Sequence, residues 1–162
     1  MNNAQWSIPF LIETLDDEWD EAPSTPGIYV ISYKKPINRL AKNDPKGIVY
    51  IGKSKKLRNR LWQFWYAQHP ASGFIWKNPD IASKITGKKL KNHKDVENIL
   101  GSFSVKAATP IDKNILDAAE RAVMYAYIRI YGELPPLNFS IPKRWNNVPK
   151  EKDIKWANKG LV

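Results

Sequence analysis

The chain has 162 residues, no cysteine and a formal net charge of +10. Hydrophobic residues make up 43% of it and aromatic residues 12%, which is typical of one globular domain and not of a disordered chain. The lack of cysteine excludes disulfides and thiolate metal sites, no apolar run reaches the length of a membrane span, and we expect a cytoplasmic protein.

Charge is distributed unevenly along the chain. Residues 1–33 contain six acidic side chains and no lysine or arginine, so the remainder carries 26 basic against 10 acidic residues. Such an excess favours a polyanion as partner, nucleic acid above all, with an affinity that falls as salt rises. Charge alone leaves open the alternative that a lysine-rich surface serves only solubility.

The first third of the chain predicts an arm followed by two strands. Residues 1–22 indicate an irregular arm with at most one helical turn, and the prolines within 23–26 enforce an extended approach. Residues 27–33 are β-branched or aromatic at most positions, which predicts a strand inside a sheet. Residues 34–46 contain two prolines and five basic side chains, and they predict a long exposed loop before an antiparallel strand at 47–52.

The residues after this second strand predict an amphipathic helix. Ser54 is a typical residue to cap its N-terminus. At about 100° per residue, four apolar side chains form one arc, and Arg60 lies about 40° beyond its edge, on the rim of the buried face. The arc consists of Leu57, Leu61, Phe64 and Trp65.

The middle of the chain predicts an insertion and a third strand. Residues 67–80 are rich in turn-forming residues, and residues 80–100 indicate helix in pieces, interrupted at Gly87. Residues 102–107 alternate between apolar and polar side chains, which is typical of a half-buried strand.

A long helix is predicted over 110–131. Thr109 and Pro110 have the cap and first-position signals of a helix start, and Gly132 has the signal of its end. Glu120 lies at the margin of the apolar stripe of this helix. Residues 139–162 are basic and predict an arm or an additional layer.

Several of these residues, in this order, resemble the motifs of the GIY-YIG nuclease family. The matching elements are Gly27-Ile28-Tyr29, Tyr50-Ile51-Gly52, Lys53, Arg60, Glu120 and Asn138. The resemblance covers residues 26–138 and implies an α/β (α+β) sandwich with a small three-stranded antiparallel sheet flanked by helices. Residues 1–25 would then form an N-terminal arm and residues 139–162 a basic C-terminal arm.

The resemblance implies a DNA endonuclease in which Tyr29 is the general base. A tyrosine with a pKa near about 10 is a poor base at neutral pH, so a neighbouring positive charge must favour its phenolate. Lys53, which follows the adjacent strand, is the candidate for that charge. Arg60 offers a planar guanidinium to the phosphate oxygens.

The same resemblance assigns the metal and the supporting residues. Glu120 would hold one Mg²⁺ or Mn²⁺ ion, with water at the other coordination positions. Tyr50 would orient the water or the phosphate, and Asn138 would stabilise the site by hydrogen bonding. No spacing of acidic residues supplies the several carboxylates of a two-metal site.

The predicted partner is DNA, although the residues do not exclude RNA. The basic residues expected to contact it are Lys55, Lys56, Arg58, Lys88, Lys89 and Lys91. Such a chain would be a stand-alone or restriction-like nuclease, and a homodimer or two sequential nicks would each give a double-strand cut.

One position departs from the family pattern. A His or Tyr is usual one helical turn after the arginine, whereas this chain has Phe64 there. The alternative interpretation is therefore a module of the same fold that binds nucleic acid with little or no hydrolysis. A basic protein-binding scaffold is a third, weaker interpretation.

Overall fold

The computed structural model describes residues 4–12, 23–65, 79–90, 93–140 and 148–162. Within them, one antiparallel sheet has the strand order β1-β5-β3-β4, and β2 also pairs with β5. The strands are β1 (Gln5–Trp6), β2 (Phe10–Leu11), β3 (Gly27–Tyr33), β4 (Ile48–Ser54) and β5 (Phe103–Thr109). The predicted α/β class with a helix-flanked antiparallel sheet is confirmed, but the sheet has five strands and not three.

The two additional strands come from residues 4–12, where the sequence predicted an irregular arm. Gln5 pairs with Thr109 and Phe10 with Val105, along the side of β5 that faces away from β3. These residues satisfy backbone groups of β5 that would otherwise form an open sheet edge. The remainder of the predicted arm, residues 13–22, lies outside the described residues.

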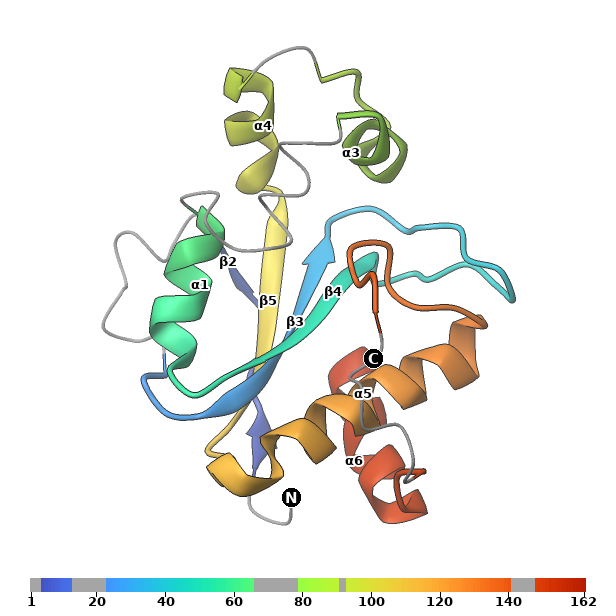
Figure 1. Ribbon diagram of the computed structural model, residues 1–162. Coiled ribbons are helices and arrows are strands. Elements are labelled where there is room, and N and C mark those ends of the chain that lie inside the picture. Colours follow the sequence, from blue (N-terminus) through green and yellow to red (C-terminus); the bar gives the residue numbers. More distant parts are fainter. Residues whose placement is uncertain (1–3, 13–22, 66–78, 91–92, 141–147) are drawn as a thin grey trace.

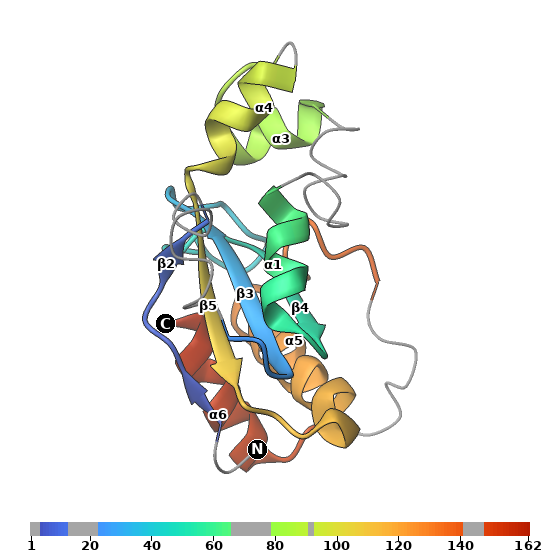
Figure 2. The same ribbon diagram turned by 90° about the vertical axis from the view of Figure 1, so that its left-hand side faces the viewer.

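The helices form a layer on each face of the sheet. Helix α1 (Leu57–Trp65) lies on one face, and helices α5 (Leu116–Tyr131) and α6 (Glu151–Leu161) lie on the other (Figures 1 and 2). Each layer encloses its own apolar core, and β3 contributes alternate side chains to the two cores. No helix in the described ranges is both long and apolar enough to cross a membrane.

Helix α1 begins three residues later than its expected cap. The hydroxyl of Ser54 accepts a hydrogen bond from the backbone N–H of Lys56 at 3.0 Å, so it closes a turn before the helix and does not cap it. The backbone N–H of Arg58 donates instead to the carbonyl of Pro23 at 2.9 Å. A partner distant in sequence thus satisfies the free N–H groups of the helix end.

The prediction of a helix start at Thr109 and Pro110 is wrong. The backbone N–H of Ile111 donates to the carbonyl of Pro26 at 2.9 Å, and this side chain is buried, so the chain stays non-helical there. A short 3₁₀ turn, η3 (Lys113–Ile115), follows, and the Asp112 carboxylate accepts a hydrogen bond from a backbone N–H of that turn at 2.8 Å.

Helix in pieces, predicted for residues 80–100, is confirmed in the described part of this segment. Helices α3 (Pro79–Thr86) and α4 (His93–Leu100) lie beyond the end of the sheet at which β3 finishes (Figures 1 and 2). The Tyr33 hydroxyl, on the last residue of β3, donates to the carbonyl of Thr86 at 3.4 Å. The N-termini of α1 and α5 lie at the opposite end of the strands.

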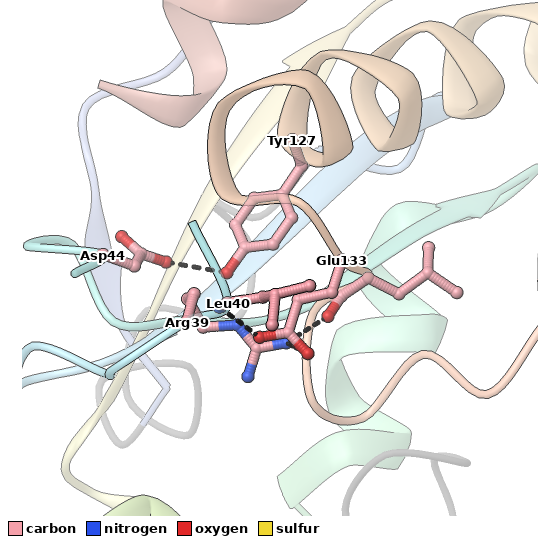
Figure 3. A network of polar contacts seen from close by, with 6 residues as sticks. Arg39, Leu40, Asp44, Tyr127 and Glu133 are labelled. Carbon is pink, nitrogen blue, oxygen red and sulfur yellow. Dashed lines mark hydrogen bonds and ion pairs between the residues drawn. The ribbon is translucent and has the colours of Figure 1, made fainter. Parts of the chain in front are cut away.

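The loop between β3 and β4 is less exposed than its composition predicts. Ile37 and Asp44 form an antiparallel bridge across it, and Asp44 is completely buried. The Tyr127 hydroxyl donates to the Asp44 carboxylate at 3.0 Å, and Arg39 pairs with Glu133 at 3.2 Å (Figure 3). Burial, and then the Asp44 charge, raise the pKa of the Tyr127 phenol, so it stays a hydrogen-bond donor. These contacts fix the loop to the C-terminal end of α5.

Candidate active site

Regular pairing between β3 and β4 places two tyrosines on one face of the sheet, and an irregularity in β4 follows directly beyond them. Tyr50 pairs with Ile31, but the next residue of β3 pairs with Ile48, so Val49 is the extra residue of a β-bulge. The bulge shifts the side-chain alternation of the strand. Tyr29 lies opposite Gly52 and Tyr50 lies opposite Ile31, so both tyrosines contact the core on the α1 side; beyond the bulge, Ile48 contacts the core on the α5 side.

In both strand motifs, neighbouring atoms leave no space for a side chain at the glycine. Gly52 lies opposite Tyr29, and a Cβ atom there would lie 2.5 Å from the Tyr29 hydroxyl oxygen and 2.7 Å from a ring carbon of Tyr50. Without that atom the two rings stack, with centroids 6.0 Å apart and planes at 30°. A Cβ atom at Gly27 would lie 2.5 Å from the carbonyl oxygen of Ala108 on β5. Both motifs therefore require close approach of neighbouring groups.

The two phenols differ in their surroundings. Burial, followed by the neighbouring Tyr50, raises the pKa of Tyr29 well above its ordinary value, and the Arg60 guanidinium opposes this only in part. Tyr50 is half-buried; burial raises its pKa, whereas the hydrogen bond with Tyr29 and the charges of Arg60 and Lys53 lower it. The cation that acts on Tyr29 is therefore Arg60, and not Lys53 as the sequence led us to expect.

Lys53 is occupied by two carboxylates of α5. Its ammonium group forms an ion pair and hydrogen bond with Glu120, and it lies 3.2 Å from Oδ1 of Asp117. These two acids are three positions apart, so they lie on the same side of the first turns of the helix. Glu120 is only 7% exposed; burial raises the pKa of its carboxyl group, and the ion pair with Lys53 opposes that shift.

The donor chemistry at these carboxylates fits a divalent cation. An ammonium group already lies against both carboxylates, so the place is electrostatically suited to positive charge. Carboxylate oxygens are the ligands that Mg²⁺ and Mn²⁺ prefer. Glu120 and Asp117 are the carboxylates here that could hold such an ion, and in the described residues no three His, Cys, Asp or Glu side chains converge.

Asn138 positions β4 from its outer edge. Its side-chain oxygen accepts a hydrogen bond from the backbone N–H of Ile51 at 2.8 Å, and its amide nitrogen donates to the carbonyl of the same residue at 2.8 Å. The side chain thus substitutes for a neighbouring strand, directly between Tyr50 and Gly52. Asn138 therefore positions the Tyr50-Ile51-Gly52 segment, and its side chain bonds to this backbone and not to the carboxylates of Glu120 and Asp117.

A cleft of about 460 Å³ opens between the N-terminus of α1 and the η3–α5 segment. Its lining residues are Lys53, Ser54, Lys55, Lys56, Asn59, Arg60, Gln63, Lys113, Leu116 and Asp117. Five of these residues are basic and only Asp117 is acidic. Tyr29, Tyr50 and Glu120 do not line the cleft, but they connect to it through Lys53 and Arg60.

Three of the residues predicted to bind nucleic acid are close to this cleft. Lys55 and Lys56 line it, and Arg58 lies on the first turn of α1. Lys113 also lines the cleft, but we did not identify it from the sequence. It belongs to the 3₁₀ turn capped by Asp112, and the Asp-x-Asn turn signal could have indicated that this segment is not helix.

The other predicted nucleic-acid contacts lie elsewhere. Lys88 and Lys89 are exposed in the segment after α3, at the opposite end of the strands from the cleft. Lys91 lies outside the described residues.

No protein-family model and no curated protein matches the chain. Solved structures that are similar to it include three point mutants of the GIY-YIG N-terminal endonuclease domain of UvrC from Thermotoga maritima, bound to its catalytic divalent cation. Sequence identity is 20% for one and 18% for the other two, and the TM-score is 0.41 for each. The similarity covers 79% of this chain and 98% of the other, and it is one of fold alone.

Proposed function

We propose that this chain is a GIY-YIG nuclease, a divalent-metal-dependent endonuclease that hydrolyses phosphodiester bonds of DNA. The observation that carries this proposal is the cluster of Tyr29, Tyr50, Arg60, Lys53 and Glu120 beside one strongly basic cleft. The phenols, the guanidinium and the buried carboxylate come from four separate elements, so their convergence is a property of the whole fold. A surface that served only solubility would not need buried charged groups behind it.

The residues divide the reaction between them. The oxygen of a water molecule forms a bond to phosphorus while its proton passes to the Tyr29 phenolate, and the bond from phosphorus to the 3′ oxygen breaks. The 3′ oxygen then takes a proton from solvent. Arg60 stabilises the charge that develops on the non-bridging oxygens, and Tyr50 holds the Tyr29 oxygen in place through their hydrogen bond.

Glu120, with Asp117 beside it, would hold the divalent ion. When bound, that ion would neutralise charge on the phosphate and on the departing oxygen. Lys53 contacts both carboxylates and keeps their negative charge compensated in the protein itself.

A plasmid-nicking assay tests the proposal. Supercoiled DNA is incubated with the purified protein and Mg²⁺ or Mn²⁺, beside Glu120→Gln and the control Glu151→Gln, which removes an exposed carboxylate of α6. We expect nicking by the wild type and the control, and a loss of at least about a hundredfold in Glu120→Gln. Equal activity of the wild type and Glu120→Gln would refute a nuclease centred on this carboxylate.

One observation favours the alternative of a module that binds DNA with little hydrolysis. Phe64 is fully buried and packs edge-on against Phe103, with ring centroids 5.7 Å apart, so it offers no polar group to the site. Retention of DNA by the wild type and by Glu120→Gln without nicking by either would support this alternative.

A further inference from the structure

Three lysines that line the cleft have no carboxylate partner among the described residues. Within the described part of the chain, Lys55, Lys56 and Lys113 make no salt bridge, whereas Lys53 in the same lining pairs with Glu120. Among the described residues, the cleft therefore contains one ammonium group that is paired with carboxylates and three that are not, which we call the uncompensated lysines. Uncompensated charges of one sign that line a concave surface concentrate counter-ions there.

The uncompensated lysines come from two different elements. Lys55 and Lys56 lie in the turn between β4 and α1, and Lys113 lies on η3, just before α5. A merely solvated helix face would present its charges from a single element. Here the fold brings two basic segments 57 positions apart in sequence to the same cleft, and Arg60 lies in the same lining.

We propose that Lys56 and Lys113 together bind one phosphate group of the DNA backbone that flanks the phosphate under attack. This inference rests on the proposed function and extends it from the reacting phosphate to its neighbour on the strand. Arg60 is linked to the phenols, and Lys53 to the carboxylates, so the remaining ammonium groups are available to a further phosphate. Lysine suits this role because it acts as a point charge on a flexible stem.

Salt dependence of DNA binding gives a test that needs neither a known recognition sequence nor metal. The affinity of a 20-base-pair duplex is measured by fluorescence anisotropy at several salt concentrations with no divalent ion present. The slope of log affinity against log salt changes by about 0.9 for each phosphate contact. We expect Lys113→Ala and Lys56→Ala each to weaken binding about fivefold and to reduce the slope.

The double variant distinguishes one shared phosphate from two. If both lysines bind the same phosphate, Lys56→Ala/Lys113→Ala reduces the slope by about 0.9 in total and the losses of affinity are not additive. A reduction of about 1.8 would overturn the proposal in favour of separate phosphates, and an unchanged slope would overturn it altogether. Lys152→Ala is the matched control, because this exposed lysine lies on α6, which contributes no residue to the lining of the cleft, and it should retain the wild-type slope.

The outcome is separable from that of the nicking assay. If the protein binds DNA with the expected slopes but does not nick it, the proposed nuclease function is refuted and the proposed phosphate site is supported. If it nicks DNA, Lys113→Ala should raise KM about fivefold and leave kcat within about twofold, since the contact precedes the chemical step. A loss of kcat at unchanged KM would place Lys113 in the reaction itself and overturn the proposal.

Discussion

Tyr29 is a phenol that is 1% exposed and holds its proton strongly, which would make the proposed reaction dependent on pH. Because its pKa is raised, the phenolate fraction is small at neutral pH and increases about tenfold with each pH unit below that pKa. We expect the rate of nicking to rise across pH 6 to 9 without a plateau. A plateau within this range would show that another group is the base.

Two substitutions complete the pH test. Tyr29→Phe should abolish both the rate and its pH dependence, because the phenyl ring fills the same space without the hydroxyl group. Tyr33→Phe is the control, since Tyr33 is buried on the same face of β3 and its hydroxyl makes only a 3.4 Å hydrogen bond to Thr86. It should keep the wild-type profile.

Lys53 lies against the carboxylate to which a divalent ion would bind. A divalent ion that binds Glu120 has to displace or share the ammonium group that now contacts it. In DNA-free protein at pH 8, Lys53→Met should therefore bind Mn²⁺ about tenfold more tightly, by electron paramagnetic resonance, as expected from loss of a charged hydrogen bond. Lys55→Met, which removes a cleft lysine that pairs with no carboxylate of the described residues, should leave the affinity unchanged. Equal affinities in both variants would contradict the competition.

The residues of the site differ in how far the sequence could predict them. Tyr29, Tyr50, Arg60 and Glu120 were identified because motif order and helical periodicity are local properties of the chain. The ion pair between Lys53 and Glu120 was not predicted, because it depends on where the first turns of α5 lie against β4. Lys113 and the bulge at Val49 were missed for the same reason: both are defined only once strands and helices have packed.

At the scale of elements, one side chain binds the backbone of β4 at its outer edge. Asn138 makes two hydrogen bonds to the backbone of Ile51, and it is 9% exposed. Asn138→Ala leaves both backbone groups without these partners, which should lower the free energy of unfolding by about 1–3 kcal/mol in urea titrations. Asn114→Ala, at an exposed position of η3, should change it by less than about 0.5 kcal/mol. Equal stability of the two variants would contradict the role given to Asn138.

Element boundaries show where local signals were insufficient. The strand at 27–33 and the end of α5 at Gly132 follow from β propensity and a glycine stop signal. The second strand, predicted at 47–52, runs from Ile48 to Ser54, two residues further than expected. The start of α5 does not, because the hydrogen bond of Ile111 to the carbonyl of Pro26 overrides the Thr-Pro cap signal. Strands β1 and β2 have two residues each, too few for an alternation pattern, and pairing with β5 alone defines them.

At the scale of the molecule, α1 lies between the cleft and a second basic segment, which contains Lys88 and Lys89. Its N-terminus lies at the cleft, and the helix runs toward α3 and α4, where Lys88 and Lys89 are exposed (Figures 1 and 2). A strand of seven residues, such as β3, spans about 23 Å. Duplex DNA carries a charge about every 1.7 Å of its axis, so a duplex seated in the cleft presents phosphates over this whole distance.

We therefore expect the DNA to contact both ends of the α1 side. Lys88→Ala/Lys89→Ala should lower the salt slope of duplex binding by about 1 to 2, while the nicking rate at saturating DNA stays within about twofold of wild type. The matched control is Lys152→Ala/Lys155→Ala on α6, which removes the same charge from the layer on the other face of the sheet. If binding were driven by net charge alone, both double variants would lose the same slope, because long-range attraction does not distinguish the two faces. A slope that falls only for Lys88→Ala/Lys89→Ala would show that the duplex lies along α1. An unchanged slope in that variant would confine the DNA contact to the cleft end of the molecule.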